Sequence, residues 1–107
     1  MAIPEIDVDE LARRLESGGA LVDVREADEY EQGHIPAAQL VPLSELTERV
    51  DELPEAPPLL LVCRSGARSM RAAEYLAGLG FEPINVAGGT LAWIASGRDV
   101  VAGPAPA

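Results

Sequence analysis

The sequence predicts an α/β fold in which a parallel sheet lies between two layers of helices. Short apolar runs, typical of buried strands, alternate along the chain with segments whose apolar residues recur at helical spacing. The run at residues 59–62 (LLLV) is apolar at every position, as in central parallel strands that are covered on both faces. Strands that alternate with helices indicate parallel pairing through crossover helices.

The first half of the chain is expected to begin with a short extended segment and a helix. Asp7 is the expected N-cap, with Glu10 at the spacing of a capping box, and Gly18 and Gly19 are expected to end the helix. Later elements follow from composition: a strand at 20–24 (ALVDV), one or two acidic helical turns at 26–32, a loop at 33–36 (GHIP) and a short strand at 38–41.

The second half is expected to contain three more helices and two strands. Ser44 is the expected N-cap of a helix that ends before Pro54. After the strand at 59–62, the apolar positions Met70, Ala73, Leu76 and Ala77 predict a helix, which Gly80 is well placed to end. A strand at 83–86, the pair Gly88-Gly89 and a short helix through Trp93 complete the pattern, and we expect Trp93 to pack in the core.

We expect one domain over residues 1–101 and a disordered tail over residues 102–107 (AGPAPA). The chain has 107 residues, a length typical of a single domain, and 48% of them are hydrophobic. There is no apolar run long enough to cross a membrane and no apolar segment near the start that would indicate secretion. A single cysteine excludes an internal disulfide, so we expect a reducing, cytoplasmic setting.

The net charge of −10 argues against nucleic acid and anionic membranes as partners, because binding to phosphate needs a basic surface. All eight positive charges are arginines. One His and one Cys are too few for a zinc site of the usual ligand number, so we expect no metal.

The candidate site is Cys63, which stands where the apolar strand ends and the next helix is about to begin (CRSGARS, residues 63–69). Ligands of parallel sheets bind at this edge. A free cysteine has a pKa of about 8.5, and a helix N-terminus or a nearby cation lowers it to roughly 3.5–7.5. The turn at Gly66 can aim backbone N–H groups at one centre, and Arg64 and Arg68 add charge. We therefore expect a thiolate in an anion-binding cradle.

A lone cysteine at a strand end is usually a small core residue, but the polar turn after Cys63 favours a reactive thiol. His34 is the only histidine and lies in the GHIP loop, where we interpret it as a structural residue that holds the loop. A hydrolase with a Cys-His dyad is therefore not expected.

Four segments, in this order, resemble the single-domain rhodaneses, the thiosulfate sulfurtransferase-like family. They are LVDVRE (21–26), EYEQGHIPAA (29–38), LLLVCRSGARS (59–69) and GGTLAW (88–93). Together they span about two thirds of the chain. The family more often has Gly where Ala37 stands, which matters only if that position needs a positive φ.

The resemblance implies a three-layer rhodanese-like fold with a five-stranded parallel sheet and helices on both faces. It implies that Cys63 takes a sulfane sulfur from a donor such as thiosulfate, becomes a persulfide, and yields that sulfur to a thiophilic acceptor such as cyanide or a protein thiol. No cofactor is required. The substrate would be held by Arg64, Ser65, Gly66, Ala67, Arg68 and Ser69.

The resemblance also covers Asp23 and Arg25, which we interpret as positioning groups. We expect Arg25 to pair with a nearby carboxylate such as Glu26 or Glu29.

Two alternatives stay open. A phosphatase or arsenate reductase on the same scaffold would need an Arg six residues after the cysteine to bind the oxyanion. In this sequence Ser69 occupies that position, and Arg68 is only five residues after Cys63. A sulfur carrier or regulatory module that docks onto a partner protein would use the same Cys63 with little turnover of its own.

Overall fold

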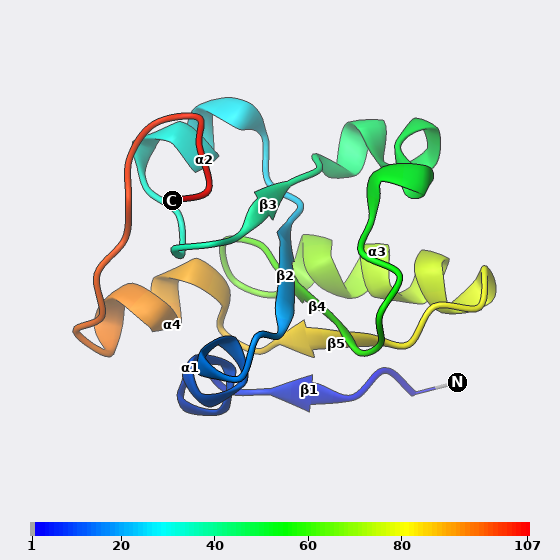
Figure 1. Cartoon of the computed structure of the whole chain (residues 1–107), viewed down its shortest axis with the longest axis horizontal. Coiled ribbons are helices and arrows are strands. Elements are labelled where there is room, and N and C mark those ends of the chain that lie inside the picture. Colours follow the sequence, from blue (N-terminus) through cyan, green and yellow to red (C-terminus); the bar gives the residue numbers. More distant parts are fainter. Residues whose placement is uncertain (1) are drawn as a thin grey trace.

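The computed structural model describes residues 2–107, and five strands form one parallel sheet in the order β1-β5-β4-β2-β3 (Figure 1). The strands are β1 (Glu5–Ile6), β2 (Ala20–Asp23), β3 (Gln39–Leu40), β4 (Leu59–Val62) and β5 (Pro83–Val86). The helices are α1 (Val8–Glu16), α2 (Ala27–Gln32), α3 (Ala67–Gly78) and α4 (Gly89–Ala95), with short 3-10 helices at η1 (Leu43–Glu48) and η2 (Val50–Glu52). The predicted α/β class and five-stranded sheet are confirmed.

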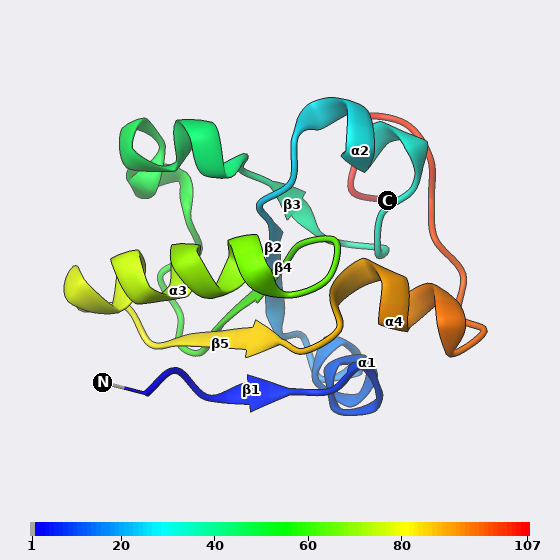
Figure 2. The same ribbon diagram turned by 180° about the vertical axis from the view of Figure 1, so that it is seen from behind.

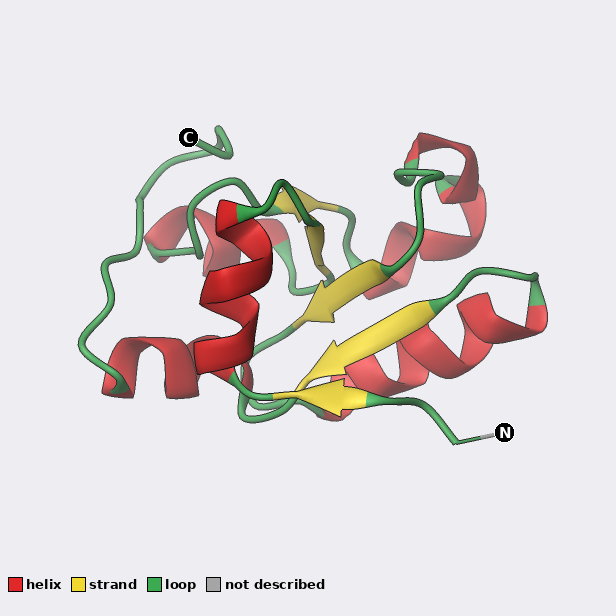
Figure 3. Cartoon of the chain, turned by 60° about the horizontal axis from the view of Figure 1, so that its bottom comes forward, coloured by secondary structure: helices red, strands yellow, loops and turns green. Residues whose placement is uncertain are grey.

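The central strand β4 divides the core into two layers, because alternate residues of a strand point to opposite faces. Leu59 and Leu61 pack with α3 and η1 on one face, whereas Leu60 and Val62 pack with α1, α2 and α4 on the other. Figure 3 shows the strands with helices on both sides. All four residues of β4 are buried, which explains why this run is apolar throughout.

Two local predictions were wrong. Ser44 does not cap an α-helix: Pro42 stands before η1, and the Ser44 hydroxyl donates to the Glu26 carboxylate. The apolar positions Leu43 and Leu46 lie three residues apart, which suits the three-residue turn of a 3-10 helix. At α1, Asp7 accepts from the backbone N–H of Glu10 as expected, but the Glu10 carboxylate binds two arginines of its own helix instead of closing the capping box.

Ala37 adopts φ = 74°, in the left-handed region that favours glycine. The departure from the family's more usual Gly at this position therefore has an energetic cost. The Ala37 N–H donates to the Pro106 carbonyl at 2.7 Å, which joins this turn to the C-terminal segment.

Residues 102–107 form no helix or strand in the structure, and backbone hydrogen bonds join Gly103 to Glu31 and Pro106 to Ala37. The expected disorder of this tail stays a prediction. A disordered tail would require both of these hydrogen bonds to break. Among residues 2–107, no helix has the length and apolar character that crossing a membrane demands.

Candidate active site

Cys63 directly follows β4 and is 1% exposed, at the carboxyl edge of the sheet. The loop after it turns back on the sulfur, and Gly66 makes this turn with φ = 112°, a backbone conformation strained for any other residue. The backbone N–H of Gly66 consequently donates to the Cys63 Sγ at 3.1 Å. Gly66 is also the N-cap of α3, so the positive end of that helix lies beside the sulfur.

Several donors converge on the sulfur. The Ser69 hydroxyl, which is fully buried, donates to Sγ at 3.2 Å. Burial raises the pKa of the Cys63 thiol, but hydrogen bonds from the Ser69 hydroxyl and from the backbone N–H groups of Ser69, Gly66 and Ser65 outweigh burial and hold the pKa below its ordinary value. The arrangement stabilises a thiolate, or any anionic sulfur in its place.

The start of α4 holds the main chain of Cys63 from the other side. The backbone N–H and hydroxyl of Thr90 both donate to the Cys63 carbonyl, at 2.9 and 3.0 Å. Gly89 permits this approach, since a Cβ there would lie 2.5 Å from the Cys63 oxygen. The Gly-Gly pair was a visible signal in the sequence, but the role of Thr90 was missed.

Asp23 and Arg25 form a buried ion pair, with Arg25 Nη2 2.8 Å from Asp23 Oδ2. The expected pairing of Arg25 with Glu26 or Glu29 was wrong. The backbone N–H of Arg25 donates to the Asp23 carboxylate as well, so the chain bends after β2 and returns the guanidinium onto its neighbour two residues back. Arg25 also donates to the Gly33 carbonyl and thereby joins the end of β2 to the end of α2.

Arg68 and Glu29 form a second ion pair, with two hydrogen bonds of 2.7 and 2.8 Å. The Arg68 guanidinium holds the pKa of the Glu29 carboxyl at about 2, so this carboxylate is charged at neutral pH. The pair connects the first turn of α3 to α2. Arg64 is exposed and, within the described residues, has no carboxylate at salt-bridge distance.

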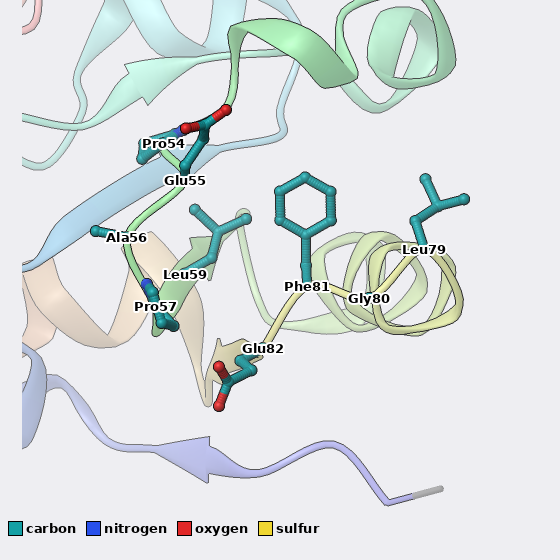
Figure 4. A pocket seen from close by; sticks show the side chains of 9 residues that line it. All are labelled: Pro54, Glu55, Ala56, Pro57, Leu59, Leu79, Gly80, Phe81 and Glu82. Atoms are coloured by element: carbon teal, nitrogen blue, oxygen red, sulfur yellow. The ribbon is translucent and has the colours of Figure 1, made fainter.

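A hollow of about 240 Å³ lies beside the loop, between α2 and α4. Figure 2 shows the turn from β4 into α3 next to these two helices. Polar residues of the site line one part of the hollow, among them Arg64 and Glu29, and the exposed side chains of Leu91 and Ile94 line another. A second hollow, of about 310 Å³, lies at the opposite edge of the sheet from Cys63 (Figure 4). Two of its lining residues show this, because Leu59 begins β4 and Phe81 precedes β5.

His34 is fully buried and stacks on the Tyr30 ring, with ring centroids 3.6 Å apart. Its Nδ1 lies 2.8 Å from the Tyr30 carbonyl, and its backbone pairs with Val101. These contacts agree with the interpretation of His34 as a structural residue. Among residues 2–107, no three side chains of the His, Cys, Asp or Glu type form a group that could hold a metal ion.

The predicted loop residues do not all face the sulfur. Gly66 and Ser69 make direct hydrogen bonds to it and the backbone of Ser65 adds to these, whereas the side chains of Arg64 and Ala67 are exposed. The sequence did not reveal Asn85, which reaches this loop from β5 and donates to the Gly66 carbonyl.

The chain is similar to known proteins in both sequence and fold. The rhodanese-like domain family matches residues 7–96. A sulfurtransferase of Allochromatium vinosum is 38% identical over 103 residues, which cover 94% of this chain and 96% of that protein. A thiosulfate sulfurtransferase, GlpE, of Pseudomonas savastanoi is 35% identical over 85 residues, which cover 78% of this chain and 80% of that protein. The crystal structure of a rhodanese-related protein from Thermoplasma volcanium is similar with a TM-score of 0.85, at 33% identity and over 92% of this chain and 97% of that one.

Proposed function

The chain belongs to the rhodanese-like domain family, and on that premise we propose that it is a sulfurtransferase that carries sulfane sulfur on Cys63. The observation that carries the proposal is the convergence of the Gly66 N–H and the Ser69 hydroxyl on a buried sulfur. Donors arranged in this way stabilise negative charge on sulfur before and after the transfer.

In the first step the Cys63 thiolate attacks the outer sulfur of a donor such as thiosulfate. A bond forms between Sγ and that sulfur, the sulfur–sulfur bond of the donor breaks, and its electron pair leaves with sulfite. The product is an anionic persulfide on Cys63. In the second step a nucleophile such as cyanide or a protein thiolate attacks the outer sulfur, the persulfide bond breaks, and the Cys63 thiolate returns. No proton, metal or organic cofactor takes part in this exchange.

The backbone N–H groups of the loop from Arg64 to Ser69 would stabilise the persulfide. Arg64 is the better candidate for attracting an anionic donor, because Arg68 is already paired with Glu29. We accordingly assign Arg64 to donor attraction and Arg68 to holding the loop against α2. The hollow beside Arg64 is the route by which a donor or acceptor would approach.

The position of Ser69 favours sulfur transfer over phosphatase or arsenate reductase chemistry. Six residues after the cysteine, where a phosphatase loop would want an Arg for its oxyanion, the structure has a buried hydroxyl directed at the sulfur. A loop without an arginine at this position suits one additional sulfur atom on Cys63 better than a tetrahedral phosphate.

The test is thiocyanate formation from thiosulfate and cyanide by the purified protein and by Cys63→Ala. We expect turnover by the first and none by the second, with unchanged circular dichroism and thermal unfolding showing that the variant folds. Thiocyanate production by Cys63→Ala would refute the mechanism. A protein that loads sulfur on Cys63 in one turnover but gives it only to a partner thiol would instead be the carrier described above.

A further inference from the structure

Asn85 is a buried amide, 1% exposed, that the exchange chemistry does not itself use. It lies in β5 opposite Leu61 of the neighbouring strand β4, close to where that strand delivers Cys63. Its Nδ2 is 2.8 Å from a carboxylate oxygen of Glu5 and 3.2 Å from the Gly66 carbonyl oxygen. Both neighbours are acceptors and the amide nitrogen has two hydrogens, so both bonds form together.

The Gly66 carbonyl oxygen is the point at which three donors compete. It accepts one hydrogen bond from the backbone N–H of Met70, which lies near the start of α3, at 3.2 Å. It accepts another from the Asn85 amide, also at 3.2 Å. The Ser69 hydroxyl lies 3.3 Å from the same oxygen and 3.2 Å from the Cys63 Sγ. A carbonyl oxygen has two lone pairs, and a hydroxyl has one proton to donate.

We propose that Asn85 is a positioning residue: by occupying the Gly66 carbonyl together with Met70, it directs the single Ser69 hydroxyl proton to the Cys63 sulfur. The inference rests on the proposed function of Cys63 as a thiolate nucleophile. Without the amide, one lone pair of the Gly66 oxygen becomes free and the Ser69 hydroxyl turns to it. The sulfur then loses a donor, and the thiolate becomes harder to form.

A second consequence concerns the amide itself. The Asn85 Oδ1 is buried and has no hydrogen-bond partner among residues 2–107. Both hydrogen bonds of the amide are therefore made by its Nδ2, one to the Glu5 carboxylate and one to the Gly66 carbonyl.

The test is a double-mutant cycle on the rate of Cys63 alkylation by iodoacetamide, measured against pH for the wild type, Asn85→Leu, Ser69→Ala and the double variant. Asn85→Leu keeps the number and branching of the side-chain heavy atoms and removes the donor. Each single variant deprives the sulfur of one donor, and sulfur is a weak acceptor, so each should raise the midpoint by about one pKa unit, which is about a tenfold lower alkylation rate at a pH below it. The double variant should match Ser69→Ala alone, because Asn85 acts only through that hydroxyl.

An unchanged midpoint in Asn85→Leu, or a double variant whose shift is the sum of the two single shifts, would overturn the proposal. Asn85→Ala is a second route to the same measurement if the leucine does not fit, and urea unfolding shows that each variant is folded. Alkylation needs no sulfur donor, so the double-mutant cycle can be measured even if the wild type forms no persulfide. A failure of the Asn85 proposal is therefore distinguishable from a failure of the proposed sulfur transfer.

Discussion

Replacing Gly66 by alanine should separate the chemistry of the loop from its stability. Gly66 has φ = 112°, and an L-residue held in such a conformation costs about 1–3 kcal/mol. Space is not the obstacle, since a Cβ at this position would have no neighbour nearer than 3.6 Å. The variant should therefore fold, but its loop should relax away from positive φ and move the N–H at residue 66 off the sulfur.

The expected size of the effect follows from the 3.1 Å hydrogen bond that Gly66 donates to the Cys63 Sγ. Loss of a hydrogen bond to a thiolate should cost about 1.4 kcal/mol, which is one pKa unit and about a tenfold lower rate of alkylation at a pH below the pKa. The assay is the alkylation rate measured as a function of pH and followed by intact mass, with persulfide formation from thiosulfate measured on the same samples.

Gly18→Ala is the matched control. Gly18 has φ = 89° and open space around the position of its Cβ, so the substitution imposes similar backbone strain beyond the end of α1, outside the Cys63 loop. Both variants should lose similar unfolding free energy in urea, and only Gly66→Ala should lose reactivity. An alkylation rate for Gly66→Ala that stays within twofold of the wild type across the acidic limb of the pH profile would refute the role given to this N–H.

Three further predictions concern stability. Arg25→Ala should lower the unfolding free energy in urea by about 3–5 kcal/mol, because it leaves the buried Asp23 carboxylate unpaired; a loss below 1 kcal/mol would contradict this. Glu29 has a folded pKa of about 2 against 4.5, so its pairing with the half-exposed Arg68 should add stability above pH 4.5 that disappears as pH falls towards 2. Solvent screening reduces this contribution to about 1 kcal/mol, and a gap between wild type and Glu29→Gln that stays constant from pH 6 to pH 2 would exclude it. Ala37→Gly should raise the melting temperature by relieving a strain of about 1 kcal/mol, and a lower melting temperature would show that the position is not strained.

The strands and the place of Cys63 at the end of one of them could be predicted because each depends on neighbours in sequence. The run at residues 59–62 is apolar for burial on both faces, and Cys63 comes directly after it. The turn at Gly66 follows from the conformational freedom of glycine. Local pattern was sufficient for these features.

The contacts that tune the site join segments far apart in the chain. Arg68 reaches Glu29 across 39 positions, and Asn85 reaches Gly66 across 19. Both depend on the order and register of parallel strands, which no local pattern specifies. The pairing of Arg25 with Asp23 was missed for a different reason. On a regular strand, side chains two residues apart point to the same face but do not form this contact. The chain bends after β2, and the bend places the Arg25 guanidinium against the Asp23 carboxylate.

The intact mass of the reduced protein after incubation with thiosulfate, and again after addition of cyanide, shows whether Cys63 carries a sulfur atom that an acceptor can remove. We expect a gain of about one sulfur atom that peptide mapping places on Cys63 and that cyanide removes, and no gain in Cys63→Ala. No added sulfur on the wild-type protein, or sulfur that cyanide does not remove, would contradict it.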